Sequence, residues 1–237
     1  MSARPTFRPY DTRPEASRAA AEYIAQCLRT TSGQVSLALS GGSSPSDTYR
    51  ALLDLDVPWD RLWIVWVDER CVPHTHADSN VRAARTTFLN DAPIDESRIL
   101  EPPTTSANDP EGAAQTYQNR LHEALGARFS ITVAVMGMGD DGHTASLFPG
   151  SEFRDLPGDV AHTLAPPSSP VLNRLTLTLN ALDRAQHAVY LVFGDDKTEH
   201  VQRVSDGGAC PEVPAACVTP HTSNVWFVDT KAAPRVR

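Results

Sequence analysis

One histidine in a glycine-rich loop is the residue of this chain best suited to acid–base chemistry. Residues 131–150 read ITVAVMGMGDDGHTASLFPG, a buried-strand pattern that breaks into a loop containing Asp141 and His143. Imidazole titrates near pH ~6.5, so it can accept and return a proton at neutral pH. A strand that ends in a glycine-rich loop before a helix is also where α/β proteins bind anions. We therefore expect His143 to act in catalysis, with Asp141 holding the imidazole or contacting the ligand.

Three further loops carry groups that can bind an anion. The first loop consists of Ser40, Gly41, Gly42 and Ser43. Its glycines let backbone N–H groups approach a phosphate, although a tight turn would explain the same residues. Asp68 and Arg70 follow a very apolar run, where Arg70 can bind an oxyanion and Asp68 can orient it or contact sugar hydroxyls, unless both belong to a solvated turn. Lys197, at a helix start, and Arg174, before an alternating strand, are either anion ligands or exposed cations.

The spacing of apolar residues predicts strands that alternate with helices. Strands are expected at residues 6–10, 35–39, 62–67, 131–136, 160–164, 175–179, 188–193 and 224–228. Helices are expected at residues 13–29, 44–54 (with Ser44 as a cap), 79–89, 111–125 and 197–204. Residues 90–110 are polar and proline-rich and predict a long surface connection.

This alternation predicts an α/β, Rossmann-like fold in which helices cover both faces of a mostly parallel sheet. No linker divides the chain, so we expect one domain over residues 1–237. Right-handed crossovers place the carboxyl ends of parallel strands on one edge of the sheet. The loops after residues 39, 67, 136 and 193 should therefore meet at that edge and form a site.

Composition and charge exclude several other classes of protein. The 237 residues are 41% hydrophobic and 21% charged, which is enough apolar material for a full core. A formal charge of −8 argues against a general nucleic-acid surface. No apolar run approaches the roughly 18 residues of a membrane-spanning helix, and the start of the chain lacks the apolar core of a signal peptide. We expect no membrane or nucleic-acid partner.

Metal and disulfide sites are not indicated either. His74 and His76 stand close together, but no third ligand lies near them in the sequence. The cysteines are scattered and include no CxxC pair; they are Cys27, Cys71, Cys210 and Cys217. We therefore expect a reduced, cytoplasmic protein that uses no metal or other cofactor.

Six motifs together resemble those of the 6-phosphogluconolactonases, within the larger glucosamine-6-phosphate isomerase-like group. They are LSGGSSP at 39–45, WVDERCVP at 66–73, the pair Ser79-Asn80, GMGDDGHTASLFPG at 137–150, RLTLTLNAL at 174–182 and GDDK at 194–197. GHTASLFPG is the most specific of these motifs, whereas SGGSSP is shared with the isomerases. The matches run in the order found in the family and span most of the chain.

The resemblance implies hydrolysis of 6-phospho-D-glucono-1,5-lactone to 6-phosphogluconate, the second step of the oxidative pentose phosphate pathway. It implies no metal and no covalent intermediate. We expect a small sugar-phosphate substrate as a partner and a monomer or weak homo-oligomer. His143 would be the general base beside Asp141, and Arg70 would stabilise developing charge or bind substrate. The remaining implied substrate and phosphate ligands are Ser40, Gly41, Gly42, Ser43, Asp68, Asn80, Arg174 and Lys197. The chain departs from many members of the family in having no lysine at residues 165–173.

Two alternatives remain open. Glucosamine-6-phosphate isomerases carry a glutamate five residues after this histidine, where this chain has Phe148, so it lacks the extra acid–base group of that reaction. A sugar-phosphate sensor without catalysis would use the same fold. Sensors of this kind carry a helix-turn-helix module, whereas only one convincing helix precedes the strand at 35–39. Binding of 6-phosphogluconate without turnover of the lactone would identify a sensor.

Overall fold

The computed structural model describes residues 3–103 and 108–234, so part of the predicted connection, residues 104–107, lies outside the described residues. The strands are β1 (Pro5–Tyr10), β2 (Val35–Leu39), β3 (Leu62–Trp66), β4 (Asp68–Arg70), β5 (Val133–Gly137), β6 (Val160–Leu164), β7 (Asn173–Leu177), β8 (His187–Val192) and β9 (Ser223–Asp229). The α-helices are α1 (Arg13–Thr30), α2 (Ser46–Leu52), α3 (Asn80–Ala84), α4 (Pro110–Leu125), α5 (Leu179–Asp183) and α6 (Thr198–Asp206).

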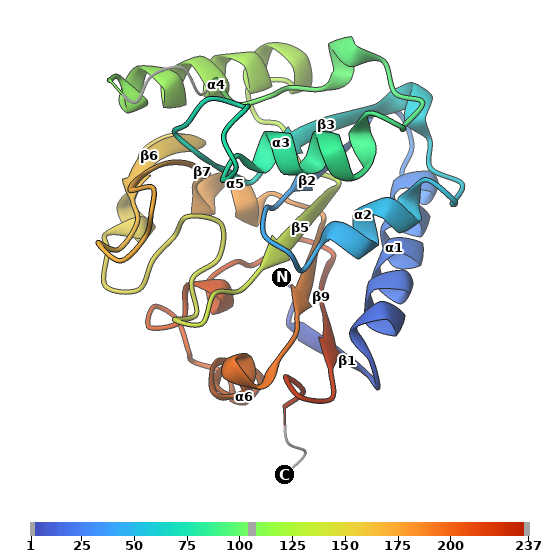
Figure 1. Ribbon diagram of the computed structural model, residues 1–237, viewed down its shortest axis with the longest axis vertical. Helices are drawn as coiled ribbons and strands as arrows, with labels where there is room; N and C mark the ends of the chain where they lie inside the picture. Colours follow the sequence, from blue (N-terminus) through green and yellow to red (C-terminus); the bar gives the residue numbers. More distant parts are fainter. Residues whose placement is uncertain (1–2, 104–107, 235–237) are drawn as a thin grey trace.

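A parallel sheet forms the centre of the molecule. Its strands are ordered β1-β9-β8-β5-β2-β3, and every neighbouring pair is parallel. β1 stands at one edge, where Pro9 without an N–H group is tolerated. In Figure 1, α1 and α2 lie to the right of this sheet and the β6–β7 hairpin lies to its left. The predicted α/β fold with a mostly parallel sheet is confirmed.

Alternate residues of the central strands build two hydrophobic cores, one on each face of the sheet. Val133 and Val189 pack with α1, α2 and α3 on one face. Ala134 and Tyr190, each one residue further along, pack with α4, α5 and α6 on the other. Because side chains alternate across a strand, a strand covered on both faces reads as a continuous apolar run. This double burial explains why residues 131–136 and 188–193 were recognisable as strands.

A second, three-stranded antiparallel sheet departs from the expected arrangement. It has the order β4-β7-β6. The residues predicted as a loop, Asp68 to Arg70, form its strand β4, because their backbone pairs with β7. The predicted strand at 175–179 is shifted to Asn173–Leu177, and α5 begins at Leu179 under the Thr178 cap. The second sheet therefore accounts for the charged residues of β4 and for the polar face of β7.

Several helix ends also differ from the prediction. α2 begins at Ser46 after Pro45, and no side chain caps it, so Ser44 is not its cap. The helix predicted at 79–89 is α3, and it is followed by one wider turn of π type over Arg85–Leu89. α1 starts as expected, because Thr12 accepts from the Glu15 N–H group and forms a capping box with it.

The cysteines provide a further correction. Cys210 and Cys217 form a disulfide, whereas Cys27 and Cys71 are free and buried. The expectation of four reduced thiols is therefore wrong for one pair. A short 3₁₀ turn at Pro214–Ala216 folds the chain back between the two cysteines, so their Cα atoms come to 5.1 Å without any CxxC spacing.

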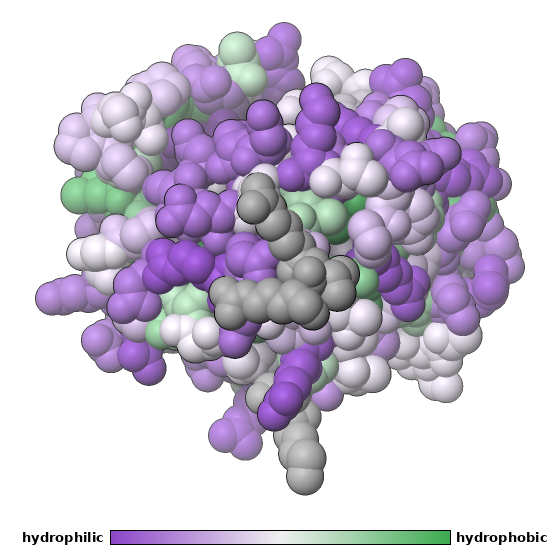
Figure 2. Space-filling view, turned by 90° about the horizontal axis from the view of Figure 1, so that it is seen from below, coloured by the Kyte–Doolittle hydropathy of each residue, from purple (hydrophilic) through white to green (hydrophobic). Residues whose placement is uncertain are grey.

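Hydrophilic side chains cover most of the face of the molecule that Figure 2 shows, with small hydrophobic areas between them. Large exposed apolar side chains are few among the described residues, Leu164 and Leu172 in the β6–β7 hairpin being the main examples. Within residues 3–103 and 108–234, no helix is both long and apolar enough to span a membrane.

Candidate active site

A cleft at the carboxyl ends of the parallel strands consists of two adjoining cavities. The first, the glycine-loop cavity, has a volume of about 180 Å³. The second, the hairpin cavity, has a volume of about 250 Å³ and reaches the β6–β7 connection at Ser169, Pro170 and Val171. Both cavities are lined by Asp68, Arg70, His143 and Ala145. Three of the four predicted loops therefore meet at one place.

His143 is held so that one ring nitrogen remains free. Its Nδ1 lies 2.6 Å from Oδ1 of Asp141, which also accepts from the His143 backbone N–H at 3.0 Å. Burial raises the pKa of Asp141, but these hydrogen bonds outweigh it and lower that pKa below its ordinary value. An ionised carboxylate can only accept, so Nδ1 carries the proton and Nε2 is the basic nitrogen. The expected partnership of Asp141 and His143 is therefore present.

The loop around His143 depends on one glycine and one strained residue. A Cβ atom on Gly139 would come within 2.1 Å of Nδ1 of His143, so a side chain there would displace the imidazole. Ala145 has φ = 49°, a left-handed conformation that costs a non-glycine residue of order 1–2 kcal/mol. Strain of this kind persists only where surrounding contacts enforce it, and it is common at functional sites.

Phe148 forms the apolar wall of the imidazole. The rings of Phe148 and His143 lie 4.8 Å apart between centroids, and Phe148 is buried. This is the position where isomerases carry a glutamate. The side chain next to the imidazole therefore supplies packing and no second acid–base group.

Two arginines face each other across β4 and β7. Arg70 is directly opposite Arg174 in this antiparallel pair. Burial, and then the charge of Arg70, lower the pKa of Arg174. Each guanidinium contacts a backbone carbonyl: Nη1 of Arg70 donates to Asp78 at 2.6 Å and Nε of Arg174 donates to Val171 at 3.0 Å. Among the ion pairs of residues 3–103 and 108–234, none involves either arginine.

This arrangement is costly unless an anion occupies the cleft. Like charges directly opposite each other in a sheet destabilise it. Arg174 is only 7% exposed, and Nε of Arg70 is buried without a hydrogen-bond partner in the described structure. An anionic ligand that contacts both guanidiniums, each through different oxygen atoms, would supply the missing countercharge with charge-assisted hydrogen bonds.

Glu69 holds this part of the cleft together, and it was missed from the sequence. It is fully buried, and its carboxylate accepts from the backbone N–H groups of Arg70 (2.7 Å), Asn80 (2.7 Å) and Val81 (2.8 Å) and from the Ser79 hydroxyl (3.0 Å). Burial raises the pKa of Glu69 in spite of these bonds. No pattern in the sequence marks this role, because only the pairing of β4 with β7 makes these residues a strand and turns Glu69 away from the side of Asp68 and Arg70.

Asn80 and Asp68 connect β4 with the glycine loop. The Asn80 amide donates to the Asp68 carbonyl at 2.9 Å, and the hydroxyl of Ser146 donates to the Asp68 carboxylate at 2.7 Å. A Cβ atom on Gly41 would come within 1.8 Å of Oδ1 of Asn80, so a side chain there would displace the Asn80 amide. The Ser40 hydroxyl is buried without a hydrogen-bond partner among the described residues. Asp68, Asn80, Ser40 and Gly41 therefore share the glycine-loop cavity, as expected.

Two predicted phosphate ligands do not line the cleft in this structure. Ser43 is absent from both linings, and its carbonyl instead accepts from Nη2 of Arg13, a contact that the sequence did not indicate. Lys197 is also absent from both linings, and its Nζ lies 2.8 Å from the carboxylate of Asp196. Gly42, with φ = 84°, does line the glycine-loop cavity.

Comparisons with known proteins agree with this fold. The family described as "Glucosamine-6-phosphate isomerases/6-phosphogluconolactonase" matches residues 11–227. A 6-phosphogluconolactonase of Synechocystis sp. is 37% identical over 210 residues, covering 86% of each chain. A 6-phosphogluconolactonase of Homo sapiens is 32% identical over 238 residues, covering 94% of this chain and 91% of that protein. The solved 6-phosphogluconolactonase of Trypanosoma cruzi superposes with a TM-score of 0.85 at 25% identity, covering 98% and 97% of the two chains. The chain therefore belongs to the glucosamine-6-phosphate isomerase/6-phosphogluconolactonase family.

Proposed function

We propose that this cleft hydrolyses 6-phospho-D-glucono-1,5-lactone to 6-phosphogluconate. One observation carries the proposal: an imidazole whose Nδ1 is bound to Asp141 shares a cleft with Arg70 and Arg174, two arginines without a carboxylate partner in the described structure. A base and an anion site are what hydrolysis of a phosphorylated lactone requires. Similarity to the 6-phosphogluconolactonases of Synechocystis sp. and Homo sapiens supports the same reaction.

In the proposed mechanism, His143 activates water. Its Nε2 accepts a proton from a water molecule while the oxygen attacks C1 of the lactone. Negative charge then develops on the former carbonyl oxygen, where the Arg70 guanidinium stabilises it. Collapse of this intermediate breaks the bond between C1 and the ring oxygen, and the imidazolium returns its proton to that oxygen. Asp141 keeps Nδ1 protonated and stabilises the imidazolium.

The phosphate of the substrate is proposed to bind away from the reacting carbon. Arg174 and the backbone of Gly41 and Gly42 are its proposed ligands, with Ser40, Asp68 and Asn80 contacting the remainder of the sugar. Ser43 and Lys197 belong to this proposal only if they move toward the cleft on binding. Binding energy from a remote phosphate orients the lactone against His143 and lowers the activation barrier.

Phe148 favours hydrolysis over isomerisation. An isomerase must move a proton between two carbons, and the glutamate that would take part is replaced by this buried phenyl ring. The remaining groups, one imidazole and two guanidiniums, satisfy hydrolysis without a further base.

The direct test is lactone hydrolysis in a coupled assay. The lactone is generated in situ from glucose 6-phosphate, and because it also opens spontaneously, the enzyme-dependent increment is the measured quantity. We expect a large increment for the wild-type chain that His143→Asn abolishes. No increment above the spontaneous rate, with 6-phosphogluconate still bound in a titration, would replace hydrolysis by the sensor function.

We also propose that residues 1–237 act as one domain and that one chain forms a complete site, as a monomer or weak homo-oligomer. The proposed base His143 and the arginines Arg70 and Arg174 already line a common cavity within one chain. Sedimentation at several concentrations, with turnover per chain measured at each, tests this point. The cytoplasmic location stays a prediction, which fractionation of cells would check.

A further inference from the structure

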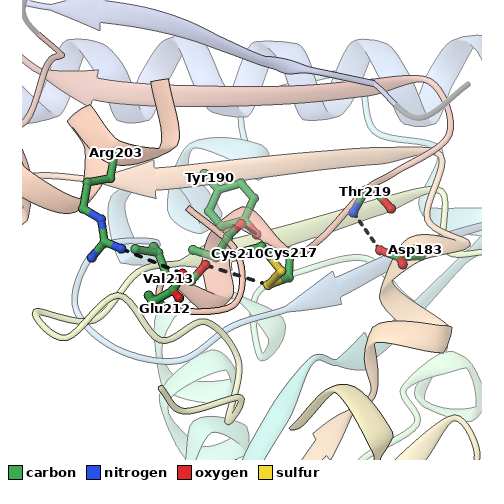
Figure 3. Close-up of a disulfide and its surroundings, with 9 residues drawn as sticks. Asp183, Tyr190, Arg203, Cys210, Glu212, Val213, Cys217 and Thr219 are labelled. Atoms are coloured by element: carbon green, nitrogen blue, oxygen red, sulfur yellow. Dashed lines mark hydrogen bonds and ion pairs between the residues drawn. A yellow bond between two sulfur atoms is a disulfide. The ribbon is translucent and has the colours of Figure 1, made fainter. Parts of the chain in front are cut away.

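We propose that the Cys210–Cys217 disulfide positions the proposed base His143, so that its reduction lowers turnover but leaves sugar-phosphate binding in place. The inference rests on the proposed role of His143. It concerns the segment 209–218, which we call the disulfide segment and which contains none of the residues that line the cleft. Figure 3 shows its two cysteines, with Glu212 and Val213, close to Tyr190.

The disulfide segment contacts the peptide unit next to His143. The backbone N–H of Ala215 donates to the carbonyl of Gly142 at 3.2 Å. Val213 is fully buried against the same glycine, where a Cβ atom would meet its Cγ1 at 3.0 Å. The position of the Gly142 carbonyl sets the plane of the peptide that leads into His143. The segment therefore supports the histidine from its N-terminal side.

A second contact reaches the residue after His143. The Tyr190 hydroxyl donates to the carbonyl of Ala215 at 3.0 Å, and the Tyr190 oxygen lies within reach of the Thr144 side chain. Thr144 in turn donates to the Gly137 carbonyl at 2.7 Å, at the end of β5. Both backbone polar groups of Ala215 are thus connected to the histidine loop, one before His143 and one after it.

The disulfide closes the segment that presents Ala215. Cys210 and Cys217 are separated by seven positions, and the 3₁₀ turn containing Ala215 lies between them. Further contacts hold the segment and the residue after it: the Thr219 N–H donates to Asp183 at 2.7 Å, and Arg203 lies 4.0 Å from Glu212 (Figure 3). These contacts keep the segment folded when the disulfide is broken, whereas the geometry of its turn then depends on weaker contacts alone.

The anion-binding side of the cleft is separate from this support. Arg70 and Arg174 lie on β4 and β7 of the antiparallel sheet. The glycine loop follows β2 and contacts Asn80. Loosening the disulfide segment should therefore displace His143 while leaving the phosphate ligands in place, which predicts a loss of kcat at nearly constant KM.

Cys210 is partly exposed, so a dithiol reagent can reach the bond. A thiolate of dithiothreitol attacks one sulfur, and its second thiol then closes a cyclic disulfide, which delivers two electrons and two protons to the protein as two cysteine thiols. Oxidised glutathione reverses the change, forming the protein disulfide and two molecules of reduced glutathione. The same enzyme sample can therefore be measured in both states.

The experiment compares kcat and KM for oxidised, reduced and reoxidised wild-type protein. Titration of thiols verifies each state, because two of the four cysteines are free before reduction. We expect reduction to lower kcat between about 5-fold and 100-fold, as small misplacements of a catalytic group do, and to change KM less than about 2-fold; reoxidation should restore kcat. An unchanged kcat on complete reduction, or a change confined to KM, overturns the inference.

Three variants assign the effect to this disulfide. Cys210→Ala/Cys217→Ala should have the kcat of the reduced wild type and no response to dithiothreitol. Cys27→Ala/Cys71→Ala should keep the full response, because its remaining cysteines are the bonded pair. If the first variant fails to fold, Val213→Ala, which retains the disulfide and truncates the contact with Gly142, should lower kcat in the same direction at constant KM. A response lost in Cys27→Ala/Cys71→Ala would also overturn the inference.

A readout without turnover separates this inference from the proposed function. Reduction should increase amide hydrogen exchange at residues 139–145 but not at residues 41–44. If wild-type protein has no lactonase activity and this exchange pattern is found, the proposed function fails while the support of the histidine loop stands. If activity falls on reduction but His143→Asn is fully active, the disulfide positions some other group and the inference fails.

Discussion

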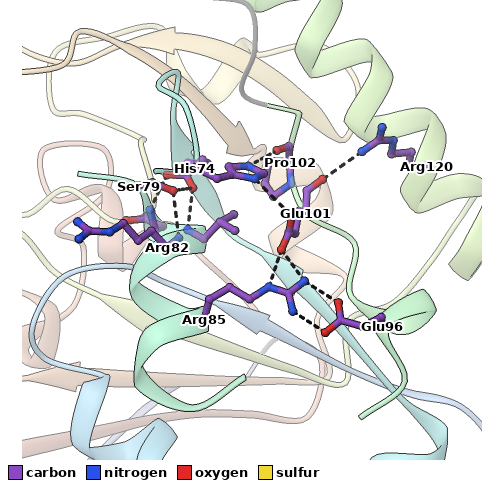
Figure 4. Close-up of polar contacts among 11 residues, drawn as sticks. His74, Ser79, Arg82, Arg85, Glu96, Glu101, Pro102 and Arg120 are labelled. Atoms are coloured by element: carbon purple, nitrogen blue, oxygen red, sulfur yellow. Dashed lines mark hydrogen bonds and ion pairs between the residues drawn. The ribbon is translucent and has the colours of Figure 1, made fainter. Parts of the chain in front are cut away.

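Two regions of this molecule each contain one histidine and two arginines, but they differ in how many of their arginines pair with a carboxylate. The cleft has His143, Arg70 and Arg174. The second region, which we call the Glu101 cluster, has His74, Arg85 and Arg120 grouped around Glu101 together with Glu96 (Figure 4). The two regions differ in the partners of their cations.

In the Glu101 cluster, carboxylates pair with His74 and Arg85, two of the three cationic side chains. Arg85 contacts Glu96 at 2.7 and 2.8 Å and Glu101 at 2.7 Å. His74 lies 3.3 Å from the Glu101 carboxylate, and Arg120 donates to the Glu101 carbonyl at 3.3 Å. The network joins the loop after β4 to α4 and to the chain before it. These ion pairs stabilise the packing of those segments.

In the cleft, the only carboxylate paired with a cationic side chain is that of Asp141, on the His143 imidazole, as far as the described residues show. The guanidiniums of Arg70 and Arg174 contact carbonyl oxygens and face each other. Guanidiniums that are held in place without a countercharge can bind an anionic ligand. Pairing of Arg85 with carboxylates, and its absence at Arg70 and Arg174, therefore distinguishes the structural region from the proposed binding region, although both contain the same residue types.

The largest expected effect is on His143. His143→Asn should lower kcat by roughly 10²–10⁴-fold, the usual contribution of a general base, while 6-phosphogluconate affinity changes only a few-fold. His122→Asn is the matched control, because His122 also pairs with an aspartate, Asp159, at 2.8 Å but lies outside both cavities. Steady-state kinetics and ligand titration of both variants make the comparison. Equal losses would show that the pairing with aspartate matters structurally and that the cleft has another base.

The next largest expected effect is on the KM of a variant at Arg174. Arg174→Met should raise KM by about 10- to 150-fold, which corresponds to charge-assisted contacts of roughly 1.5–3 kcal/mol. Arg85→Met removes a paired arginine of the Glu101 cluster and should lower the free energy of unfolding without raising KM. Kinetics together with urea unfolding distinguish the two. A normal KM for Arg174→Met would remove this residue from the phosphate site.

Much of the main sheet could be predicted because it rests on local patterns. The runs at 131–136 and 188–193 are buried on both faces and therefore read as strands without knowledge of their neighbours. The second sheet could not be predicted in the same way. β4 has three charged residues and exists because β7, about a hundred residues later, offers backbone partners. Pairing between distant segments leaves no period in a three-residue strand.

The candidate site was predictable where a motif combined a distinctive residue type with a strand end. His143, Asp141, Arg70 and Arg174 fulfil that condition, and all four lie in or beside the cleft. What could not be foreseen is the direction of individual side chains. Lys197 follows a strand end as well, yet its ammonium group pairs with its neighbour Asp196. The disulfide likewise depends on a turn geometry that cysteine spacing does not reveal.

Lys197 is the intermediate case between the paired and unpaired cations. Because its ammonium already contacts Asp196 at 2.8 Å, Lys197→Ala should raise KM by no more than about 5-fold, the scale of a surface ion pair. The measurement is KM beside that of Arg174→Met. If the two variants raise KM equally, Lys197 leaves Asp196 on binding and joins the phosphate site, as the family resemblance implies.

The smallest expected effect is on the pH dependence of stability, and it belongs to the Glu101 cluster. Its hydrogen bond to Glu101 raises the pKa of His74, and the same bond lowers the pKa of Glu101. A raised histidine pKa contributes stability that is fully present below the unfolded value of about 6.5 and is lost as the pH rises through the folded value. A lowered carboxylate pKa contributes stability that is present above about 4.3 and is lost as the pH falls through its folded value.

The contact should therefore stabilise the fold most at about pH 5 to 6. Since His74 is one-third exposed, screening keeps the contribution below about 1 kcal/mol. We measure the free energy of unfolding of wild type and His74→Asn in urea from pH 5.5 to 8.5. The difference between them should shrink as the pH rises, while the two proteins have the same kcat at each pH. Glu101→Gln should abolish the same pH-dependent part. A difference that grows with pH would mean that His74 is bound as the neutral imidazole, and that the cluster is not held by paired charge at this position.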